Sequence, residues 1–377
     1  MRQILLSLYN FFRAILQFLL KRPIAWIADR FTSSPKKENV FSSLTELYNS
    51  ITDEPGKKGP LFAFRPDEQP VIIFTDLHKG TRDGADDFAI CEDNYIAALD
   101  YYDRKKFYYI NLGDSEELWE NILPNVVKYN KKTFAAERRF VERRAFVKLF
   151  GNHDLYWGND PIAPAFLKKI YDAHMKTHAG AVLRAALPDA EIDFFCTHGH
   201  QGDAQSDGNR FSKWFVSAIW GPLQSFLEIN TNSPSCNDNN KTLHNQMMYE
   251  WSAQQSNLVL ITGHTHQPVF KSLTHLERLY LQLEEARAAK DAAREAEILN
   301  EIPRRRREYD HVNQQFRDMR PTYFNAGCCC FADGNITGIE IAEGYIRLVK
   351  WSKVDGVSQR IVAEEVHLVA LSAELYN

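Results

Sequence analysis

Residues 71–78 read VIIFTDLH, and this stretch decides the fold class of the chain. Its apolar run has the length of a buried strand, and Asp76 and His78 follow that run at once. Helical stretches separate this run from similar ones, and strands that alternate with helices predict an α/β fold with functional side chains at the carboxyl ends of the strands. The other apolar runs that end in a polar cluster are residues 106–112, 145–150, 192–197 and 258–262.

Histidine, aspartate and asparagine gather in five short clusters, one after each of these strands. Carboxylate, imidazole and amide oxygen are ligands that suit Mn, Fe or Zn. A pair of metals needs one bridging carboxylate and several ligands on each side, and loops after neighbouring strands can supply them. The pattern therefore favours a dinuclear metal site. In chain order the clusters are DLH at 76–78, GDSEE at 113–117, GNHD at 151–154, HGH at 198–200 and GHTH at 263–266.

This constellation resembles the calcineurin-like metallophosphoesterase superfamily, whose motifs are DxH, GDxx(D/E), GNH(D/E), a (G/T)H segment and GHxH. The resemblance spans roughly residues 70–352 apart from insertions. It implies a two-sheet αββα sandwich with helical insertions and two divalent metal ions, with Mn²⁺ favoured and Fe or Zn as alternatives. By the resemblance, Asp76, His78 and His266 hold one metal, Asn152, His198 and His264 hold the other, and Asp114 bridges both.

The resemblance also implies a chemistry, the hydrolysis of a phosphomonoester, phosphodiester or pyrophosphate bond. Two divalent cations lower the pKa of a bridging water, so that hydroxide forms near neutral pH and attacks phosphorus in line. His153 matches the family's catalytic histidine, and its place beside a ligand suits a general acid or a charge stabiliser at the leaving oxygen. We expect Asp154 to orient His153.

Three residues near the motifs depart from the pattern or extend it. Two histidines compete at 198–200, and the resemblance favours His198 because the family's ligand directly follows the strand. His200 is then expected to support that ligand or to bind substrate. Arg82 could clamp a phosphate bidentately, and solvent exposure is the alternative. Lys79 stands where the family commonly has an apolar residue, a difference expected to alter the cleft.

The first 31 residues predict an amphipathic helix. Residues 4–20 read ILLSLYNFFRAILQFLL, with the polar residues on one helical stripe. Arg13 interrupts the run, which therefore falls short of the roughly 20 apolar residues of a transmembrane span. Two alternatives stay open, because the apolar face could lie in a membrane interface or pack on the protein's own core. The expected location is cytoplasmic, and peripheral on the inner face of a membrane in the first alternative.

The 377 residues, 44% of them hydrophobic and 25% charged, have the composition of a globular protein with one large domain or two ordinary ones. The net charge of −4 gives no reason to expect a nucleic acid partner. We expect the second of two insertions to be a helical hairpin that breaks at Pro303. The expected division is a linker with a short helix at 32–69 and a metallophosphoesterase domain at 70–377, with insertions near 206–256 and 272–320.

The six cysteines form neither a CxxC pair nor a zinc-finger spacing, which favours a reducing compartment. Three of them are consecutive, at residues 328–330. We expect a buried and inert strand end there, and a reactive thiol is the alternative.

The substrate class stays open. The stretch from His198 to Phe226, with Asp203, Asp207, Phe211 and an aromatic-rich helix, loosely resembles the region after the fourth motif in the UDP-diacylglucosamine pyrophosphohydrolases of lipid A synthesis. Those are peripheral membrane enzymes with a helical cap over an acyl-binding cleft. With the amphipathic N-terminus, this region suits a lipid-linked phosphoester. The alternatives are a phosphoprotein or nucleotide phosphatase, and a non-catalytic metal-binding scaffold of the same fold.

Overall fold

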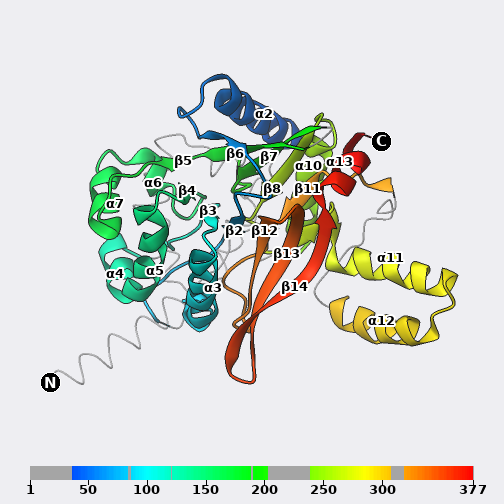
Figure 1. Cartoon of the computed structure of the whole chain (residues 1–377). Helices are drawn as coiled ribbons and strands as arrows, with labels where there is room; N and C mark the ends of the chain where they lie inside the picture. Colours follow the sequence, from blue (N-terminus) through cyan, green and yellow to red (C-terminus); the bar gives the residue numbers. More distant parts are fainter. Residues whose placement is uncertain are drawn as a thin grey trace, which may run out of the picture.

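Two seven-stranded sheets stack face to face in the computed structural model of the chain (Figure 1). Helices cover the outer face of each sheet, so the architecture confirms the predicted two-sheet αββα sandwich. The structure describes residues 36–83, 86–119, 121–187, 190–202, 238–306 and 318–376.

The first sheet combines four parallel strands with a long antiparallel meander, in the order β14-β13-β12-β2-β3-β4-β5. Its strand β12 pairs with β2, and Ile339 lies opposite Ile73. The last part of the chain therefore completes a sheet that the first motif begins. The bounds are β2 (Val71–Phe74), β3 (Tyr108–Asn111), β4 (Phe146–Leu149), β5 (Thr177–His178), β12 (Ile336–Ala342), β13 (Tyr345–Val354) and β14 (Val357–His367).

The second sheet has the order β1-β6-β7-β8-β11-β9-β10. Strands β7, β8 and β11 run parallel to one another at its centre. The bounds are β1 (Leu61–Phe64), β6 (Gly180–Ala186), β7 (Glu191–Thr197), β8 (Leu258–Thr262), β9 (Val269–Phe270), β10 (Leu273–Thr274) and β11 (Tyr323–Asn325).

Alternation along each strand builds the core between the sheets. Ile73 and Ile110 of the first sheet are buried there against Phe194 and Val259 of the second. Ile72 faces the opposite way, into the layer of helices outside the first sheet. Each such side chain contributes about 1.5–3 kcal/mol when it is fully buried.

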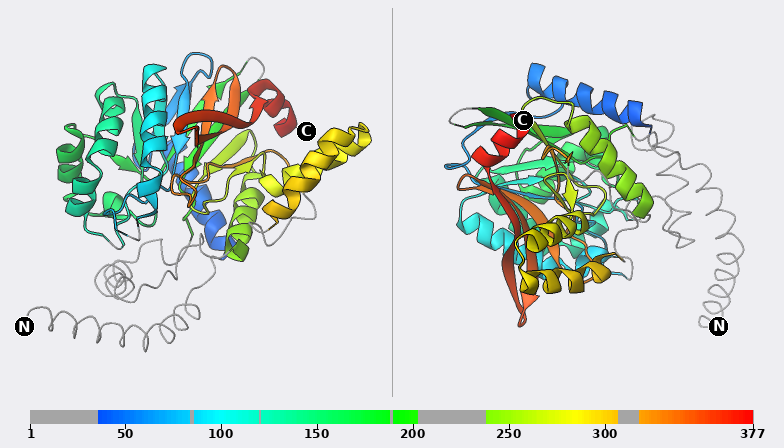
Figure 2. Two further views of the ribbon diagram at one scale, coloured as in Figure 1. Left: turned by 90° about the horizontal axis from the view of Figure 1, so that it is seen from below. Right: turned by 90° about the vertical axis from the view of Figure 1, so that its right-hand side faces the viewer.

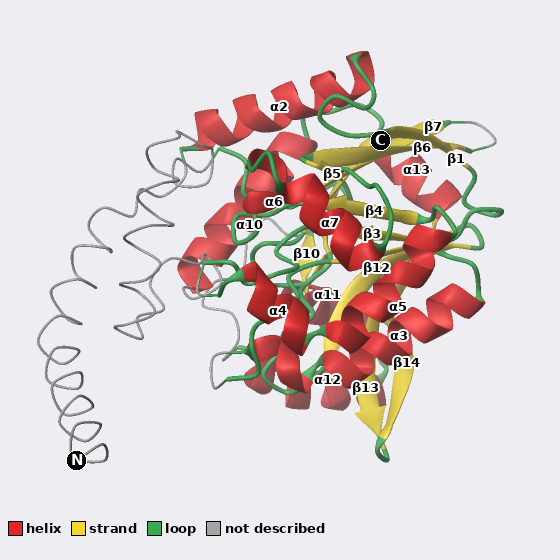
Figure 3. Ribbon diagram, turned by 90° about the vertical axis from the view of Figure 1, so that its left-hand side faces the viewer, coloured by secondary structure: helices red, strands yellow, loops and turns green. Residues whose placement is uncertain are grey.

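The outer helices bury the remaining apolar faces (Figure 3). Tyr95, Leu99 and Phe140 pack on the first sheet in one cluster, and Met248 and Trp251 pack on the second in another. The first sheet is covered by the segment with η1 (Asp87–Ile90), α3 (Glu92–Arg104), α4 (Leu123–Tyr129), α5 (Lys131–Glu142), α6 (Tyr156–Asn159) and α7 (Ala163–Tyr171). The second is covered by α2 (Lys37–Asp53) and α10 (Asp238–Ser252), and α13 (Leu368–Tyr376) ends the described chain.

Helix α2 lies in the segment that we expected to be a linker with a short helix, and it is a layer of the sandwich. Val40, Leu44, Leu47 and Ile51 recur at helical spacing and are buried against the second sheet. Strand β1 then joins the edge of that sheet beside β6. An apolar stripe of this kind is stable only when it packs on other apolar surface, so this helix belongs to the folded domain and not to a solvent-exposed linker.

Two helices form a hairpin within the expected insertion at 272–320, and this hairpin extends away from the sandwich (Figure 2). It has an apolar core of its own, in which Leu279 and Ile298 are buried. The predicted break at Pro303 is wrong, because the chain turns at 289–291 and Pro303 lies inside the second helix. The apolar faces of the two helices pack together, and this packing outweighs the lost hydrogen bond and the steric clash that a proline causes inside a helix. The bounds are α11 (His275–Ala288) and α12 (Ala292–Arg305).

Two expectations fall on residues outside the described ones, namely the amphipathic helix at 1–31 and the aromatic stretch that precedes α10. Within the described part of the chain, no helix combines the length and the apolar character that crossing a membrane requires.

Candidate metal centre

The five polar clusters meet because each follows the carboxyl end of a strand. The first sheet contributes the loops after the parallel strands β2, β3 and β4, and the second contributes those after β7 and β8. Loops at the ends of parallel strands share one edge of their sheet. The two sets touch directly, since the backbone N–H of His264 donates to Asp76 Oδ2 at 2.9 Å.

Two of the groups of possible ligand atoms in this region overlap at Asp114. The ligand atoms of Asp76, His78 and Asp114 lie within 4.8 Å of one another, and so do those of Asp114, His198 and His264. Asp114 belongs to both groups, as a carboxylate that bridges two metals must.

Motif glycines let the loops approach this closely. A Cβ atom on Gly151 would collide with the carboxylate of Asp114, and one on Gly263 would collide with Asp76 and with the hydroxyl of Thr75. Only a residue without a side chain fits at either position.

The backbone of the ligand residues is strained. Five of the seven expected ligands have φ in the left-handed region that non-glycine residues avoid. Strain of this kind persists where the surroundings enforce it, and it clusters at functional sites. The values are 50° for Asp76, 51° for His78, 46° for Asp114, 70° for His264 and 56° for His266.

Asp76 and His78 of the first group converge with His266 on one point. His266 Nε2 lies 3.2 Å from Asp76 Oδ1 and 3.2 Å from His78 Nε2. Asp76 Oδ1 is buried without a hydrogen-bond partner among the described residues. A carboxylate oxygen and two imidazole nitrogens arranged in this way fit a divalent cation.

The second group converges in the same manner. His198 Nε2 lies 3.2 Å from Asp114 Oδ2 and 3.0 Å from Asn152 Oδ1. His264 Nε2 is buried, and none of the described residues bonds to it. Burial and the neighbouring His244 and His198 lower the pKa of His264, which favours the neutral imidazole that a metal requires. The donors suit Mn, Fe or Zn without selecting among them.

His153 is held beside these groups by Glu117 and Trp119. His153 Nδ1 lies 2.7 Å from Glu117 Oε2, and the ring stacks on Trp119 with 3.9 Å between centroids. His153 Nε2 is buried and has no partner in the described structure, so one nitrogen is anchored and the other is open. Burial opposes ionisation of Glu117, but attraction to His153 and His78 outweighs it and lowers the pKa of Glu117 to about 2.

Asp154 does not orient His153 as we expected. Its Oδ1 accepts from the backbone N–H of Gly151 at 2.7 Å and of Asp114 at 3.2 Å, and its Oδ2 accepts from that of Ser115 at 2.8 Å. Asp154 therefore fastens the second and third motif loops together, because backbone donors surround its carboxylate. Burial raises the pKa of Asp154 to about 6.

The structure places His200 beside a ligand and engages Arg82 elsewhere. The His200 ring lies 5.3 Å from that of His198, and burial lowers the pKa of His200 to about 3. Arg82 Nη2 lies 2.6 Å from Glu92 Oε1 and donates to Asn130 Oδ1 at 2.9 Å. The charge of Arg82 is thus matched within the protein, which corrects its expected role as a phosphate clamp.

Three residues of the site had no predicted role. Glu117 occupies the acidic position of the second motif, and that match was the signal for it. Trp119 donates its indole N–H to the carbonyl of Asn152 at 2.8 Å. His244 of α10 places its Nε2 2.7 Å from the carbonyl of Gly199 and its ring 5.0 Å from that of His264. No sequence signal marks Trp119 or His244, since both lie outside the motifs.

The consecutive cysteines border the site. Cys328, Cys329 and Cys330 are buried and form no disulfide. Cys330 Sγ lies 3.7 Å from His266 Nδ1. A hydrogen bond with Cys328 and burial raise the pKa of the Cys330 thiol, and a protonated thiol is a poor nucleophile.

Comparison with known proteins gives one match at the level of families. The model of a family described as calcineurin-like phosphoesterase matches residues 69–268, which hold all five polar clusters. No curated protein sequence matches the chain.

Several solved structures are similar at low identity. Vacuolar protein sorting 29 from Cryptosporidium parvum is 12% identical with a TM-score of 0.30, over 79% of this chain and 98% of that one. Wild-type Vps29 complexed with Zn from Entamoeba histolytica is 14% identical with a TM-score of 0.28, over 80% and 99%. A dimetal phosphatase from Danio rerio is 8% identical with a TM-score of 0.36, over 78% and 99%. Likenesses this weak establish no function for the chain.

Proposed function

Because the chain belongs to the calcineurin-like phosphoesterase family, we propose that it is a hydrolase of phosphoric esters that works with two divalent metal ions, Mn²⁺ in first place. The observation that carries the proposal is the carboxylate of Asp114, which belongs to both groups of ligand atoms. The full set of expected ligands is present, which favours activity over a non-catalytic scaffold.

The chain supplies the ligands and holds them in place. Two bound divalent cations acidify water and neutralise charge on a phosphoryl group. Backbone donors fix the carboxylates that would hold them, since His264 N–H bonds to Asp76 and His153 N–H bonds to Asp114 Oδ1 at 2.8 Å. One metal would be held by Asp76, His78 and His266, the other by Asn152, His198 and His264, and both by Asp114.

His153 is the proposed general acid. Glu117 engages Nδ1 and leaves Nε2 as the open ring nitrogen, and stacking on Trp119 fixes the plane of the ring. The open Nε2 is then the nitrogen that gives a proton to the leaving oxygen.

For the substrate we propose a lipid-linked phosphoester. The support is the sequence of residues 4–20, whose apolar stripe and cationic Arg13 suit a membrane interface. A nucleotide or a phosphoprotein is the competing substrate, and a substrate panel separates them.

The test is hydrolysis by the purified full chain with Mn²⁺. We expect turnover of bis(4-nitrophenyl) phosphate or 4-nitrophenyl phosphate, and loss of it in Asp114→Asn. Metal analysis of the same variant should show that both metals are held more weakly, because the shared anionic ligand is gone. A folded, metal-loaded wild-type protein without turnover on these esters, a nucleotide sugar, a phospholipid and a phosphopeptide would instead support a scaffold.

A further inference from the structure

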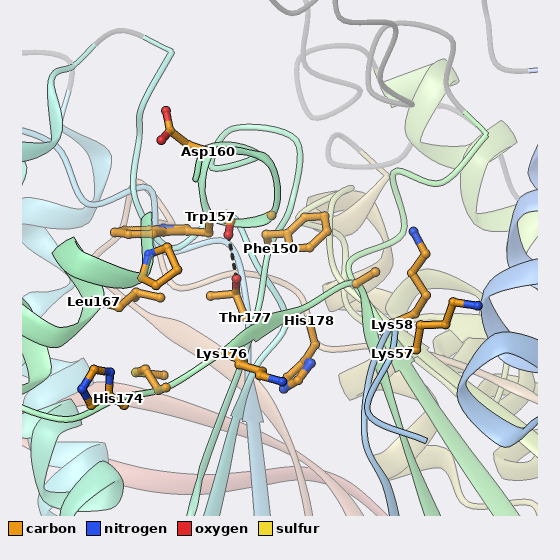
Figure 4. A pocket seen from close by; sticks show the side chains of 14 residues that line it. Lys57, Lys58, Phe150, Trp157, Asp160, Leu167, His174, Lys176, Thr177 and His178 are labelled. Atoms are coloured by element: carbon orange, nitrogen blue, oxygen red, sulfur yellow. Dashed lines mark hydrogen bonds between the residues drawn. The ribbon is translucent and has the colours of Figure 1, made fainter. Parts of the chain in front are cut away.

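A second site lies beside the metal centre, in a cavity of about 630 Å³ (Figure 4). It is bounded by α6 and α7, by β5, and by the loop that joins α2 to β1. One side is cationic and the other is apolar. None of the lining residues takes part in the proposed phosphoesterase mechanism.

The cationic side carries three lysines. Lys57 and Lys58 come from the loop before β1, and Lys176 comes from the loop before β5. Lys57 pairs with Glu54 at 3.0 Å, whereas Lys58 and Lys176 form no ion pair with any described residue. The cavity also holds one acidic residue, Asp160.

The apolar side presents Phe150, Pro164 and Met175, and the nearly buried side chains of Trp157 and Leu167 complete it. Phe150 forms the end nearest the metal centre, since its ring lies 6.4 Å from that of His200. Aromatic and thioether groups of this kind pack well on a flat apolar body.

Both sides are built into the fold. The lysine loop packs so closely on the start of β6 that a Cβ atom on Gly59 would collide with the carbonyl of Gly180. The carbonyl of Lys58 accepts from the N–H of Ala179 at 2.9 Å. Thr177 Oγ1 donates to the carbonyl of Trp157 at 2.8 Å and ties the opposite wall to β5 (Figure 4). The cavity therefore exists before any ligand arrives, which lowers the cost of binding.

We propose that this cavity binds an organic anion, in which a phosphate or sulfonate group faces Lys58 and Lys176 and an apolar body lies against Phe150, Pro164 and Met175. Ligand pockets commonly pair an apolar lining with a few placed polar groups. The two unpaired lysines supply the positive charge that attracts the anionic group. The inference does not depend on whether the metal centre hydrolyses phosphoesters.

The test uses 8-anilinonaphthalene-1-sulfonate, which fluoresces in apolar surroundings, with the manganese-loaded full chain. We expect saturable binding that weakens by about tenfold or more in Lys58→Glu/Lys176→Glu, because attraction becomes repulsion. The matched control is Lys169→Glu, whose exposed lysine lies on α7 without lining the cavity, and it should bind like the wild type. Circular dichroism checks that each variant is folded.

Two further measurements locate the site. Asp114→Asn should bind the probe as the wild type does, and methanesulfonate at the same concentration should not displace it. Equal affinity in the double lysine variant, loss of binding in Asp114→Asn, or displacement by methanesulfonate would each overturn the proposal.

Discussion

At the scale of single residues, the left-handed backbone of the ligands stores free energy. Each strained residue costs about 1–3 kcal/mol. The combined cost of five such residues is comparable to the free energy of unfolding of a typical domain, which is about 5–15 kcal/mol. Hydrogen bonds such as that from His264 to Asp76 offset part of the cost. Cations that bind only the folded protein would offset more.

Removing the metals should therefore lower the melting temperature. A ligand at 100 times its dissociation constant stabilises the folded state by about 2.7 kcal/mol. Scanning calorimetry with Mn²⁺ and with a chelator measures the difference. Asp114→Asn is the control and should respond weakly, and an unchanged melting temperature in the wild type would contradict two tightly held metals.

Replacing His153 by Ala should leave metal content intact and reduce kcat by roughly 10²–10⁴-fold, the range of a general acid. The loss should shrink with leaving groups that need no proton, so 4-nitrophenyl and alkyl esters are compared. Equal losses for both would indicate charge stabilisation without proton transfer. Glu117→Gln is a second probe, because it keeps the shape and removes the charge beside Nδ1.

The motifs were sufficient to predict which polar side chains the fold brings together, because each motif follows its own strand, and their role as metal ligands stays a prediction. They were insufficient for the supporting contacts. Asp154 turns toward backbone donors and Arg82 toward Glu92. Such choices depend on neighbours that are distant in sequence, and one motif does not reveal them.

At the scale of elements, a buried network of charges ties the metal loops to the helices. Lys79 follows the first motif, Glu116 lies in the second, and Lys148 is on β4, all fully buried. Lys79 Nζ lies 3.0 Å from Glu116 Oε1 and 2.9 Å from Glu137 Oε1, and Lys148 Nζ lies 3.0 Å from Glu116 Oε2. The positive charges of the two lysines balance the negative charges of Glu116 and Glu137. This balance explains why a lysine stands at position 79.

Lys79→Met should lower the free energy of unfolding by about 3–5 kcal/mol, because it leaves the buried carboxylate of Glu137 without a cation. Lys79→Met/Glu137→Gln should recover much of the loss, since that charge is then removed. Urea unfolding measures these two variants and Glu137→Gln alone, and Lys131→Met on the exposed face of α5 is the control. A loss in the double variant that equals the sum of the single losses would contradict pairing between Lys79 and Glu137.

The strands that precede motifs were predictable from their apolar runs, whereas several other elements were not. Strand β14 reads VSQRIVAEEVH. None of its residues is buried, so its sequence has no apolar face that would predict a strand. Strand β1 is short and largely exposed. Both lie at sheet edges, where pairing with a neighbour rather than side-chain burial defines the strand.

At the scale of the molecule, the N-terminal segment lies outside the described residues, so its role is argued from sequence. Deleting residues 1–31 should release the protein from anionic vesicles and leave hydrolysis of small esters unchanged. The apolar face would supply the affinity, at about 25 cal/mol per Å² buried, and Arg2, Arg13, Lys21 and Arg22 would add attraction to anionic lipid. Sedimentation with vesicles measures it. An intact protein that stays in the supernatant, with a deletion that lowers stability, would favour packing on the core and a water-soluble substrate.

The pairing of β12 with β2 has a consequence for synthesis on the ribosome. Strand β2 emerges early, and its neighbour β12 emerges only near the end of translation. Until then the nascent chain carries an apolar strand with one open edge, which is a template for association with another chain. A stop codon between residues 267 and 335 would release a product with every expected metal ligand and an unfinished sheet. Aggregation, rather than loss of a ligand, would then be the defect of such a truncated protein.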